Sequence, residues 1–246
     1  MTEGPLSTPG PLSGAVVVGG GSGNRFGGDK LTVSIAGKPL IAWTLRAFER
    51  TAAISSIVLV VPVGREEEFR SMARAEGVTK LTSVIPGGAH RHESVKRGLQ
   101  ALPKDTELAV IHDAARPLIT PALITRCIGV AAKEGASALA APVTDTLHEA
   151  DPMGLARRTI DRTPLRAMQT PQVFRARGIR DLLDTVPGSP TDEVSLALAA
   201  GWRVPLVENS EPNIKVTWPQ DVVMAEALLR VREGKEQGNV DSGTHE

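Results

Sequence analysis

The chain has 246 residues, no net formal charge and a hydrophobic content of 41%, enough for one substantial domain, or two small ones, with a buried core. The neutral charge argues against a general affinity for nucleic acid or for an anionic membrane surface. A single cysteine, Cys127, excludes an intramolecular disulfide framework and a cysteine-rich zinc site, and it lies in an apolar stretch that predicts a buried core thiol.

Residues 1–13, rich in Pro, Gly, Ser and Thr, are expected to form a disordered leader, and residues 233–246 a disordered polar tail. Between them we expect a single domain over residues 14–232, because neither an internal repeat nor a linker-like composition divides this stretch. It contains no apolar run long enough to span a bilayer, and no basic region followed by a hydrophobic stretch opens the chain. The expected location is therefore cytoplasmic.

Short β-branched runs alternate with helical patterns from residue 15 to about residue 140. Strands are predicted at 15–18, 57–61, 81–85, 108–111 and 136–141, with helices at 40–50 and 66–75. Thr120-Pro121 predicts a further helix start, an N-cap followed by proline at the first helical position. This alternation predicts a doubly wound, mostly parallel α/β sheet covered on both faces, with ligands beyond the carboxyl ends of its strands.

The alternation stops after Pro142. Extended stretches at 143–150 and 155–160 flank Asp151-Pro152-Met153-Gly154, which predicts a protruding β-hairpin arm at about 143–162. Helical patterns at 175–185 and 191–200, a strand at 203–207 and a final helix follow. Thr217, with Gln220 three residues later, predicts a capping box at the start of that helix.

A glycine-dense loop, residues 19–30, follows the first predicted strand directly. Its glycines include Gly19, Gly20, Gly21 and Gly23. Glycines let backbone N–H groups approach an anion, and Arg25 and Lys30 add positive charge suited to a triphosphate. The loop lacks the Gly-Lys-Ser/Thr ending of a P-loop, and Phe26 stands where the dinucleotide fingerprint needs its third glycine. A turn that collects glycine for steric reasons alone remains open at this point.

Two further segments carry charge at predicted element ends. His112-Asp113-Ala114-Ala115-Arg116 follows a strand directly, so Asp113 and Arg116 face either the ligand crevice or each other as a loop ion pair. His112 is expected to be packed or hydrogen-bonded rather than catalytic. Lys215 alternates with apolar neighbours and faces either the crevice or solvent.

Other polar clusters, at 87–94, 144–146, 169–172 and 191–193, are expected in loops, and helix caps or turns suffice to explain them. The two histidines His90 and His92, with Glu93 beside them, have no further ligand at a suitable spacing, so no protein-held metal site is predicted.

Five stretches in this order resemble the 2-C-methyl-D-erythritol 4-phosphate cytidylyltransferase family from about residue 13 to residue 230. They are the glycine loop, Gly87-Gly88 with Arg91 and Ser94, residues 112–117, residues 169–174 and residues 213–217. The resemblance implies a Rossmann-like nucleotidyltransferase fold. It also implies a reaction in which the phosphate of methylerythritol phosphate attacks the α-phosphorus of CTP and releases pyrophosphate. Because two anions must meet, cations matter more than a general base.

The resemblance also implies roles for single residues. Arg25 and Lys30 would grip the triphosphate, and Lys215 would bridge the α-phosphate and the substrate phosphate. Cytosine and ribose would be held by Gly88 and Ser94. The erythritol end would contact Asp113, Arg116, Thr170 and Thr191. Its phosphate would contact Thr146 and Arg162, the latter from the neighbouring subunit of a homodimer. Mg²⁺ would be held mainly by the CTP phosphates.

The chain departs from the family pattern in the glycine loop, where Val18-Gly19-Gly20 replaces the usual Ala-Ala-Gly and Asp29 replaces the usual proline before Lys30. Three alternatives stay open. A ribitol 5-phosphate cytidylyltransferase usually carries serine and valine where this chain has Ala114-Ala115. The others are a non-catalytic nucleotide-binding module and a redox Rossmann enzyme.

Overall fold

The computed structural model describes residues 10–20, 26–185 and 191–241. Its centre is a seven-stranded sheet with the order β11-β7-β10-β6-β1-β4-β5. The strands are β1 (Ser13–Val18), β4 (Ile54–Val61), β5 (Leu81–Pro86), β6 (Leu108–Asp113), β7 (Ala136–Pro142), β10 (Arg166–Arg175) and β11 (Leu206–Glu208). Neighbouring strands pair in parallel except β10, which runs antiparallel between β6 and β7. The predicted mostly parallel α/β sheet is confirmed.

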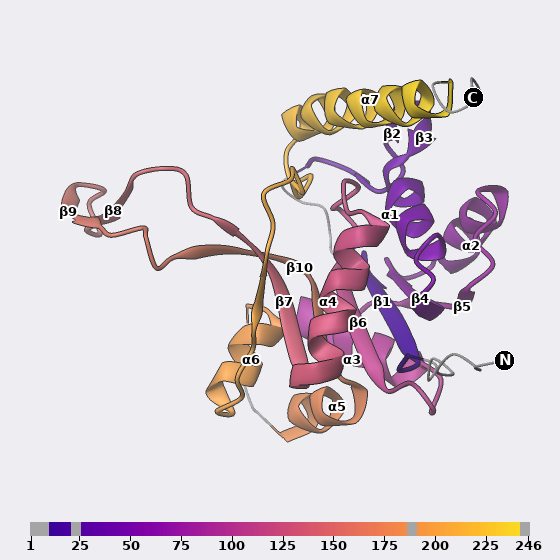
Figure 1. Cartoon of the computed structure of the whole chain (residues 1–246), viewed down its shortest axis with the longest axis horizontal. Helices are drawn as coiled ribbons and strands as arrows, with labels where there is room; N and C mark the ends of the chain where they lie inside the picture. The colour runs from indigo at the N-terminus through magenta and orange to yellow at the C-terminus, as the bar shows by residue number, and fades with distance from the viewer. Residues whose placement is uncertain (1–9, 21–25, 186–190, 242–246) are drawn as a thin grey trace, which may run out of the picture.

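Helices cover both faces of the sheet (Figure 1). One core contains residues of α1 (Leu40–Glu49), α2 (Glu66–Ala75), α4 (Pro121–Glu134) and α7 (Pro219–Asp241). The other contains residues of α3 (Arg91–Ala101), α5 (Ala176–Thr185) and α6 (Glu193–Ala199). Strand β1 shows the alternation that requires both layers: Ala15 and Val17 belong to the first core and Val16 to the second, all fully buried.

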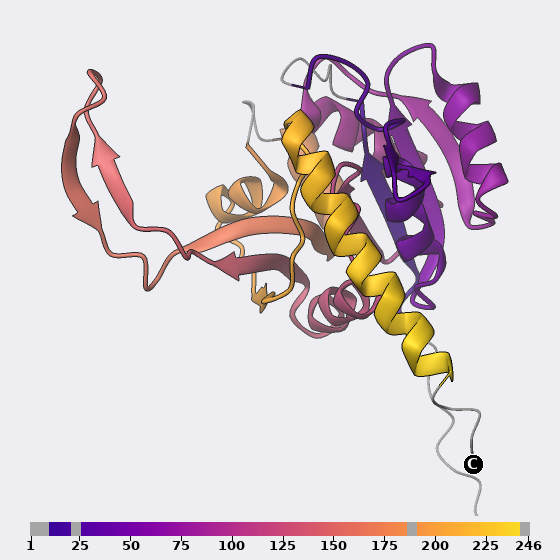
Figure 2. The same cartoon turned by 90° about the horizontal axis from the view of Figure 1, so that it is seen from above.

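The arm is a separate hairpin of β8 (Leu147–Ala150) and β9 (Ala156–Ile160), which pair antiparallel. It protrudes well away from the sheet and its helices (Figures 1 and 2). The predicted arm is thus confirmed. A second small hairpin, β2 (Ser34–Ile35) with β3 (Lys38–Pro39), lies beside α7.

Every strand predicted before residue 142 lies inside an observed strand. Three other predictions differ from the structure. Residues 169–172 were expected in a loop and lie inside β10, where Thr170 and Gln172 are buried because their side chains find hydrogen-bond partners. Residues 91–94 open α3 rather than a loop. The strand expected at 203–207 begins and ends later, as β11 (Leu206–Glu208), because these are the residues that pair with β7.

The last helix differs from its prediction at both ends. It begins at Pro219, and the Asp221 carboxylate accepts the N–H groups of Thr217 and Trp218 at 2.8 and 2.9 Å. The capping acid is therefore Asp221, not Gln220, because proline is suited to the first helical position and so sets Trp218 as the N-cap. The helix continues to Asp241, past the domain end expected at residue 232. Among the described helices, none combines the length and apolar character needed to cross a bilayer.

Candidate active site

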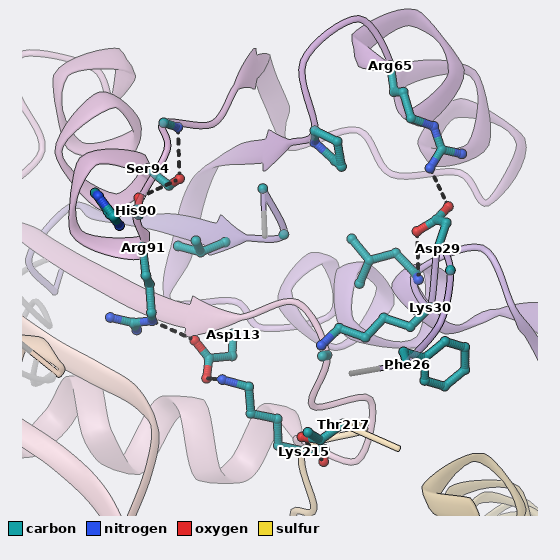
Figure 3. A pocket seen from close by; sticks show the side chains of 18 of the residues that line it. Phe26, Asp29, Lys30, Arg65, His90, Arg91, Ser94, Asp113, Lys215 and Thr217 are labelled. Atoms are coloured by element: carbon teal, nitrogen blue, oxygen red, sulfur yellow. Dashed lines mark hydrogen bonds and ion pairs between the residues drawn. The ribbon is translucent and has the colours of Figure 1, made fainter. Parts of the chain in front are cut away.

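A cavity of about 580 Å³ lies at the carboxyl ends of the parallel strands. Its walls come from the loop after β1, the loops after β4 and β5, the end of β6 and the segment before α7 (Figure 3). Seven of the residues singled out in the sequence line it: Gly19, Gly20, Lys30, Gly88, Ser94, Asp113 and Lys215. The fold thus brings together four segments that are far apart in the chain, namely residues 19–30, residues 88–94, the end of β6 and the segment before α7.

The first glycines of the loop allow two backbones to approach closely. A Cβ atom at Gly20 would lie 3.0 Å from the Cα atom of Gly87, and one at Gly19 would lie 2.6 Å from a methyl carbon of Leu31. A side chain at either position would displace its neighbours. The steric explanation therefore applies to these two glycines, whereas their predicted contact with CTP stays a prediction. Gly21, Gly23 and Arg25 lie outside the described residues, so their predicted roles stay predictions.

Asp113, at the end of β6, is the central charge of the site. Its Oδ2 atom accepts a hydrogen bond from Lys215 Nζ at 2.7 Å, and its Oδ1 atom accepts one from Arg91 Nε at 3.1 Å (Figure 3). Burial opposes ionisation, but the charges of Arg91 and Lys215 outweigh it and hold the pKa of Asp113 well below its ordinary value. Of the two predicted orientations of Lys215, the structure shows the one facing the crevice.

The loop ion pair considered for Asp113 and Arg116 is weak, because Arg116 Nε lies 4.0 Å from Asp113 Oδ2. Arg116 instead donates to the carbonyl oxygen of Asn213 at 2.7 Å, which ties the end of β6 to the segment carrying Lys215. Its buried Nε atom has no hydrogen-bond partner among the described residues. Burial lowers the pKa of Arg116.

His112 and Thr170 form a buried network behind Asp113. Thr170 Oγ1 accepts the N–H of Asp113 at 3.0 Å and lies 3.0 Å from His112 Nδ1. Since the Thr170 hydroxyl accepts from Asp113, its proton is available to His112 Nδ1, which assigns the neutral imidazole with its proton on Nε2. Burial lowers the pKa of His112 to about 3. The expectation of a packed, non-catalytic histidine agrees with this position, whereas the substrate contact predicted for Thr170 stays a prediction.

Lys30 lies across the cavity from this network, and its side chain extends toward Asp113 and Lys215 (Figure 3). The carboxylate of the neighbouring Asp29 is turned toward Thr32 and Arg65. It accepts hydrogen bonds from Thr32 at 2.7 Å and from the guanidinium of Arg65. Burial opposes its ionisation, but these hydrogen bonds outweigh it and lower the pKa of Asp29. The acid that departs from the family pattern is therefore paired with Arg65.

Ser94 lies in the first turn of α3, where its hydroxyl shapes the turn beside the cavity. It accepts the N–H of Gly88 at 3.0 Å and reaches the carbonyl oxygen of His90 at 3.2 Å. Arg97 supports the same turn by donating to the carbonyl of Gly87 at 2.7 Å. Gly88 and Ser94 thus act together in forming the wall where the base and ribose are predicted.

Five predicted substrate residues do not line the cavity: Arg116 and Thr170, which are described above, and Thr146, Arg162 and Thr191. Thr191 precedes α6 and is exposed, and the N-cap of that helix is Asp192, whose side chain accepts the N–H of Ser195 at 2.8 Å. Thr146 and Arg162 are exposed residues of the arm, and Arg162 donates to the carbonyl of Thr144. Their predicted contacts with the substrate phosphate remain predictions. Cys127 is buried as expected, and burial raises the pKa of its thiol to about 12.

Three charged residues of this region had no role in the site predicted from the sequence, although Arg91 belongs to one of the five family stretches. Arg65 lines the cavity, Arg91 contacts Asp113, and Glu193 pairs with Arg91 at 2.7 Å. Arg91 had a signal, since it stands between the Gly-Gly pair and Ser94. Glu193 had none, because a glutamate at a helix start is ordinary and only the tertiary packing buries it.

The comparisons with known proteins agree over nearly the whole chain. The family model described as 2-C-methyl-D-erythritol 4-phosphate cytidylyltransferase matches residues 14–231. A curated relative of that name from Pelotomaculum thermopropionicum is 39% identical over 90% of this chain and 95% of its own length. One from Desulforamulus reducens is 41% identical over 89% of this chain and 96% of its length. A crystal structure of the Thermus thermophilus protein superposes with a TM-score of 0.69 at 31% identity, covering 89% and 99% of the two chains.

Proposed function

Because the chain belongs to the 2-C-methyl-D-erythritol 4-phosphate cytidylyltransferase family, we propose that it joins CTP and 2-C-methyl-D-erythritol 4-phosphate. The products are 4-CDP-2-C-methyl-D-erythritol and pyrophosphate, made in non-mevalonate isoprenoid biosynthesis. One observation supports this most directly: Lys30 and Lys215 line the same cavity from opposite segments, at the strand ends where a nucleotide is expected.

The chemistry fits this arrangement. The attacking phosphate oxygen is already anionic, so the reaction needs no general base, and the chief difficulty is bringing two anions together while negative charge develops on the leaving pyrophosphate. Lys215, oriented by Asp113 at 2.7 Å, would lie between the α-phosphate and the attacking phosphate. Lys30, and Arg25 from the same loop, would stabilise the triphosphate.

We propose that Mg²⁺ enters with CTP and is held mainly by its phosphate oxygens. The described part of the chain contains no group of three or more His, Cys, Asp or Glu side chains that could hold a metal by themselves. Asp113, the carboxylate at the end of β6, already accepts from Lys215 and Arg91. The ion would therefore neutralise charge on the nucleotide while the protein supplies the cations around it.

We also propose a homodimer in which the arm reaches the partner's site, and a cytoplasmic location. The side chains of β8 and β9 are mostly exposed, and an isolated two-stranded hairpin has little stability in water. A partner subunit would cover the arm and place Arg162 near the substrate phosphate.

An assay of pyrophosphate release with CTP tests the substrate. Methylerythritol phosphate and ribitol 5-phosphate are compared at equal concentration, each without enzyme as the blank. We expect turnover with the first and little with the second. Ala115 lines the cavity, so the valine usual in the ribitol enzymes would narrow it. Turnover of ribitol phosphate alone would overturn the proposal, and release with neither polyol would favour a non-catalytic module.

A further inference from the structure

A second carboxylate lies behind the cavity wall and has no part in the chemistry above. Glu193, the first residue of α6, has a side chain only 1% exposed. Both of its oxygens accept from Arg91 Nη1, at 2.7 and 2.9 Å. Arg91 in turn donates through Nε to Asp113, so a continuous line of charges runs from Glu193 through Arg91 and Asp113 to Lys215.

Stability alone does not account for this buried pair. Removing ions from water costs several kcal/mol for each ion, and replacing a buried ion pair by apolar groups of similar size is often neutral or stabilising. The apolar residues of α6 already pack on the sheet, since Val194, Leu196 and Ala197 are buried in the second core. The pair is therefore better explained by what it holds in place.

Glu193 fixes the direction from which Arg91 meets Asp113. A guanidinium carries five N–H donors in a rigid planar fork. Because both oxygens of Glu193 hold Nη1, the plane of the Arg91 guanidinium is set, and its Nε donates to Asp113 at Oδ1. The other oxygen, Oδ2, remains for Lys215 at 2.7 Å.

The same contact fixes the start of α6. Gln172 supports it from β10, accepting the N–H of Val194 at 3.2 Å and donating to Asp192 at 2.8 Å. Thr191, which is predicted to contact the erythritol end, directly precedes this helix start. The line of charges thus joins that segment to the carboxylate predicted to contact the same substrate.

We propose that Arg91, oriented by Glu193, is a positioning residue: it sets the direction of the Asp113 carboxylate and ties the start of α6 to the polyol end of the site. The proposal rests on the proposed function for the identity of the polyol phosphate. A purely structural role would affect both substrates and would disappear when stability is restored. The positioning role instead predicts a raised KM for the polyol phosphate alone, which persists when stability is restored.

The test compares Arg91→Met, Glu193→Met and the double variant. Arg91→Met takes away the ion-pair partner of the buried Glu193 carboxylate, and Glu193→Met leaves the Arg91 guanidinium with Asp113 alone, so both should lower the melting temperature. The double variant should recover most of that loss. Its KM for methylerythritol phosphate should stay raised by about tenfold or more, while its KM for CTP changes by less than about threefold.

Lys96→Met is the matched control, because it also removes a cation from α3. Lys96 pairs with Asp184 at 2.6 Å, and this ion pair lies on the surface. Both KM values should match the wild type. Recovery of wild-type KM together with the melting temperature in the double variant would overturn the positioning role, as would an equal rise in both KM values. Absence of pyrophosphate release by the wild type would instead overturn the proposed function.

Discussion

Asp113 is the residue on which the arrangement of cations depends. Lys215, Arg91 and Arg116 all lie within 4.0 Å of its carboxylate, although each comes from a different segment. Without that negative charge the three cations would repel one another in a partly buried space. Asp113 therefore concentrates positive charge where two phosphates are expected to meet.

Lys215→Ala should lower kcat by about a hundredfold or more, since one preorganised charge that stabilises a transition state typically contributes that much. Asp113 keeps its contact with Arg91, so the far-UV circular dichroism and the unfolding midpoint should change little. Steady-state pyrophosphate release measures kcat. Lys104→Ala, an exposed lysine that does not line the cavity, is the control. An unchanged kcat in Lys215→Ala would refute the role given to it.

His112 predicts a pH dependence of stability. Its pKa is lowered by burial to about 3 in the folded protein, whereas an unfolded histidine titrates near about 6.5. Between these values the unfolded chain binds a proton that the folded chain does not. The free energy of unfolding should therefore fall as the pH decreases below about 6.5, by about 1.4 kcal/mol per pH unit from this group.

Urea unfolding between about pH 7 and about pH 5 measures this slope. His112→Gln should reduce it by the amount of one proton, even though the variant is less stable throughout. Equal slopes in the two proteins would show that His112 is not the group responsible.

At the scale of elements, the sequence predicts the parallel half of the sheet well and the antiparallel part poorly. The strands from β1 to β7 in the central sheet are apolar runs, and such runs can be recognised as strands from the sequence alone. Strand β10 contains Gln169, Thr170 and Gln172, and it is a strand because tertiary partners satisfy these polar groups: Asn209, His112 and Asp192. Local patterns carry no information about such partners.

The same limit applies to the site. Lys30, Asp113 and Lys215 could be predicted because each follows a strand end or a distinctive motif. The pairing of Arg91 with Glu193 joins residues 102 positions apart and depends on how α6 packs. The pairing of Asp29 with Arg65 likewise depends on two loops that meet only in the folded chain.

The cap of α7 gives a prediction at this scale. Asp221→Ala removes the acceptor for two backbone N–H groups and should cost about 1 kcal/mol of stability. Gln220→Ala, one residue earlier, should have little effect, although the sequence pattern favoured Gln220. The denaturant midpoints of the two variants decide between them, and a larger loss in Gln220→Ala would contradict the observed cap.

At the scale of the whole molecule, we expect that the arm can be removed without disturbing the central sheet, because β8 and β9 pair only with each other. Pro142 of β7 and Arg166 of β10 are paired neighbours, so an Asn-Gly turn in place of residues 143–165 would join them directly. We expect this variant to be monomeric by light scattering and the wild type dimeric, because the arm is the proposed contact between subunits.

Arg162→Ala is the matched point variant. It should leave the dimer intact but raise the KM for methylerythritol phosphate, since the proposed phosphate contact is lost while β8 and β9 stay paired. A dimeric armless variant would place the subunit contact elsewhere on the protein. An unchanged KM in Arg162→Ala would remove that residue from the substrate site.

The position of β10 also fixes the order in which the sheet can be assembled. Strands β6 and β7 are consecutive in the central sheet along the chain, yet they never pair, because β10 lies between them. During synthesis, the edge of β6 that later pairs with β10 therefore has no partner strand until residues 166–175 have emerged, after the hairpin arm. The residues of β6 are all buried in the folded protein, so the edge left without a partner belongs to a strand of the core. The strand that is hardest to recognise from the sequence is therefore the one that joins β6 to β7.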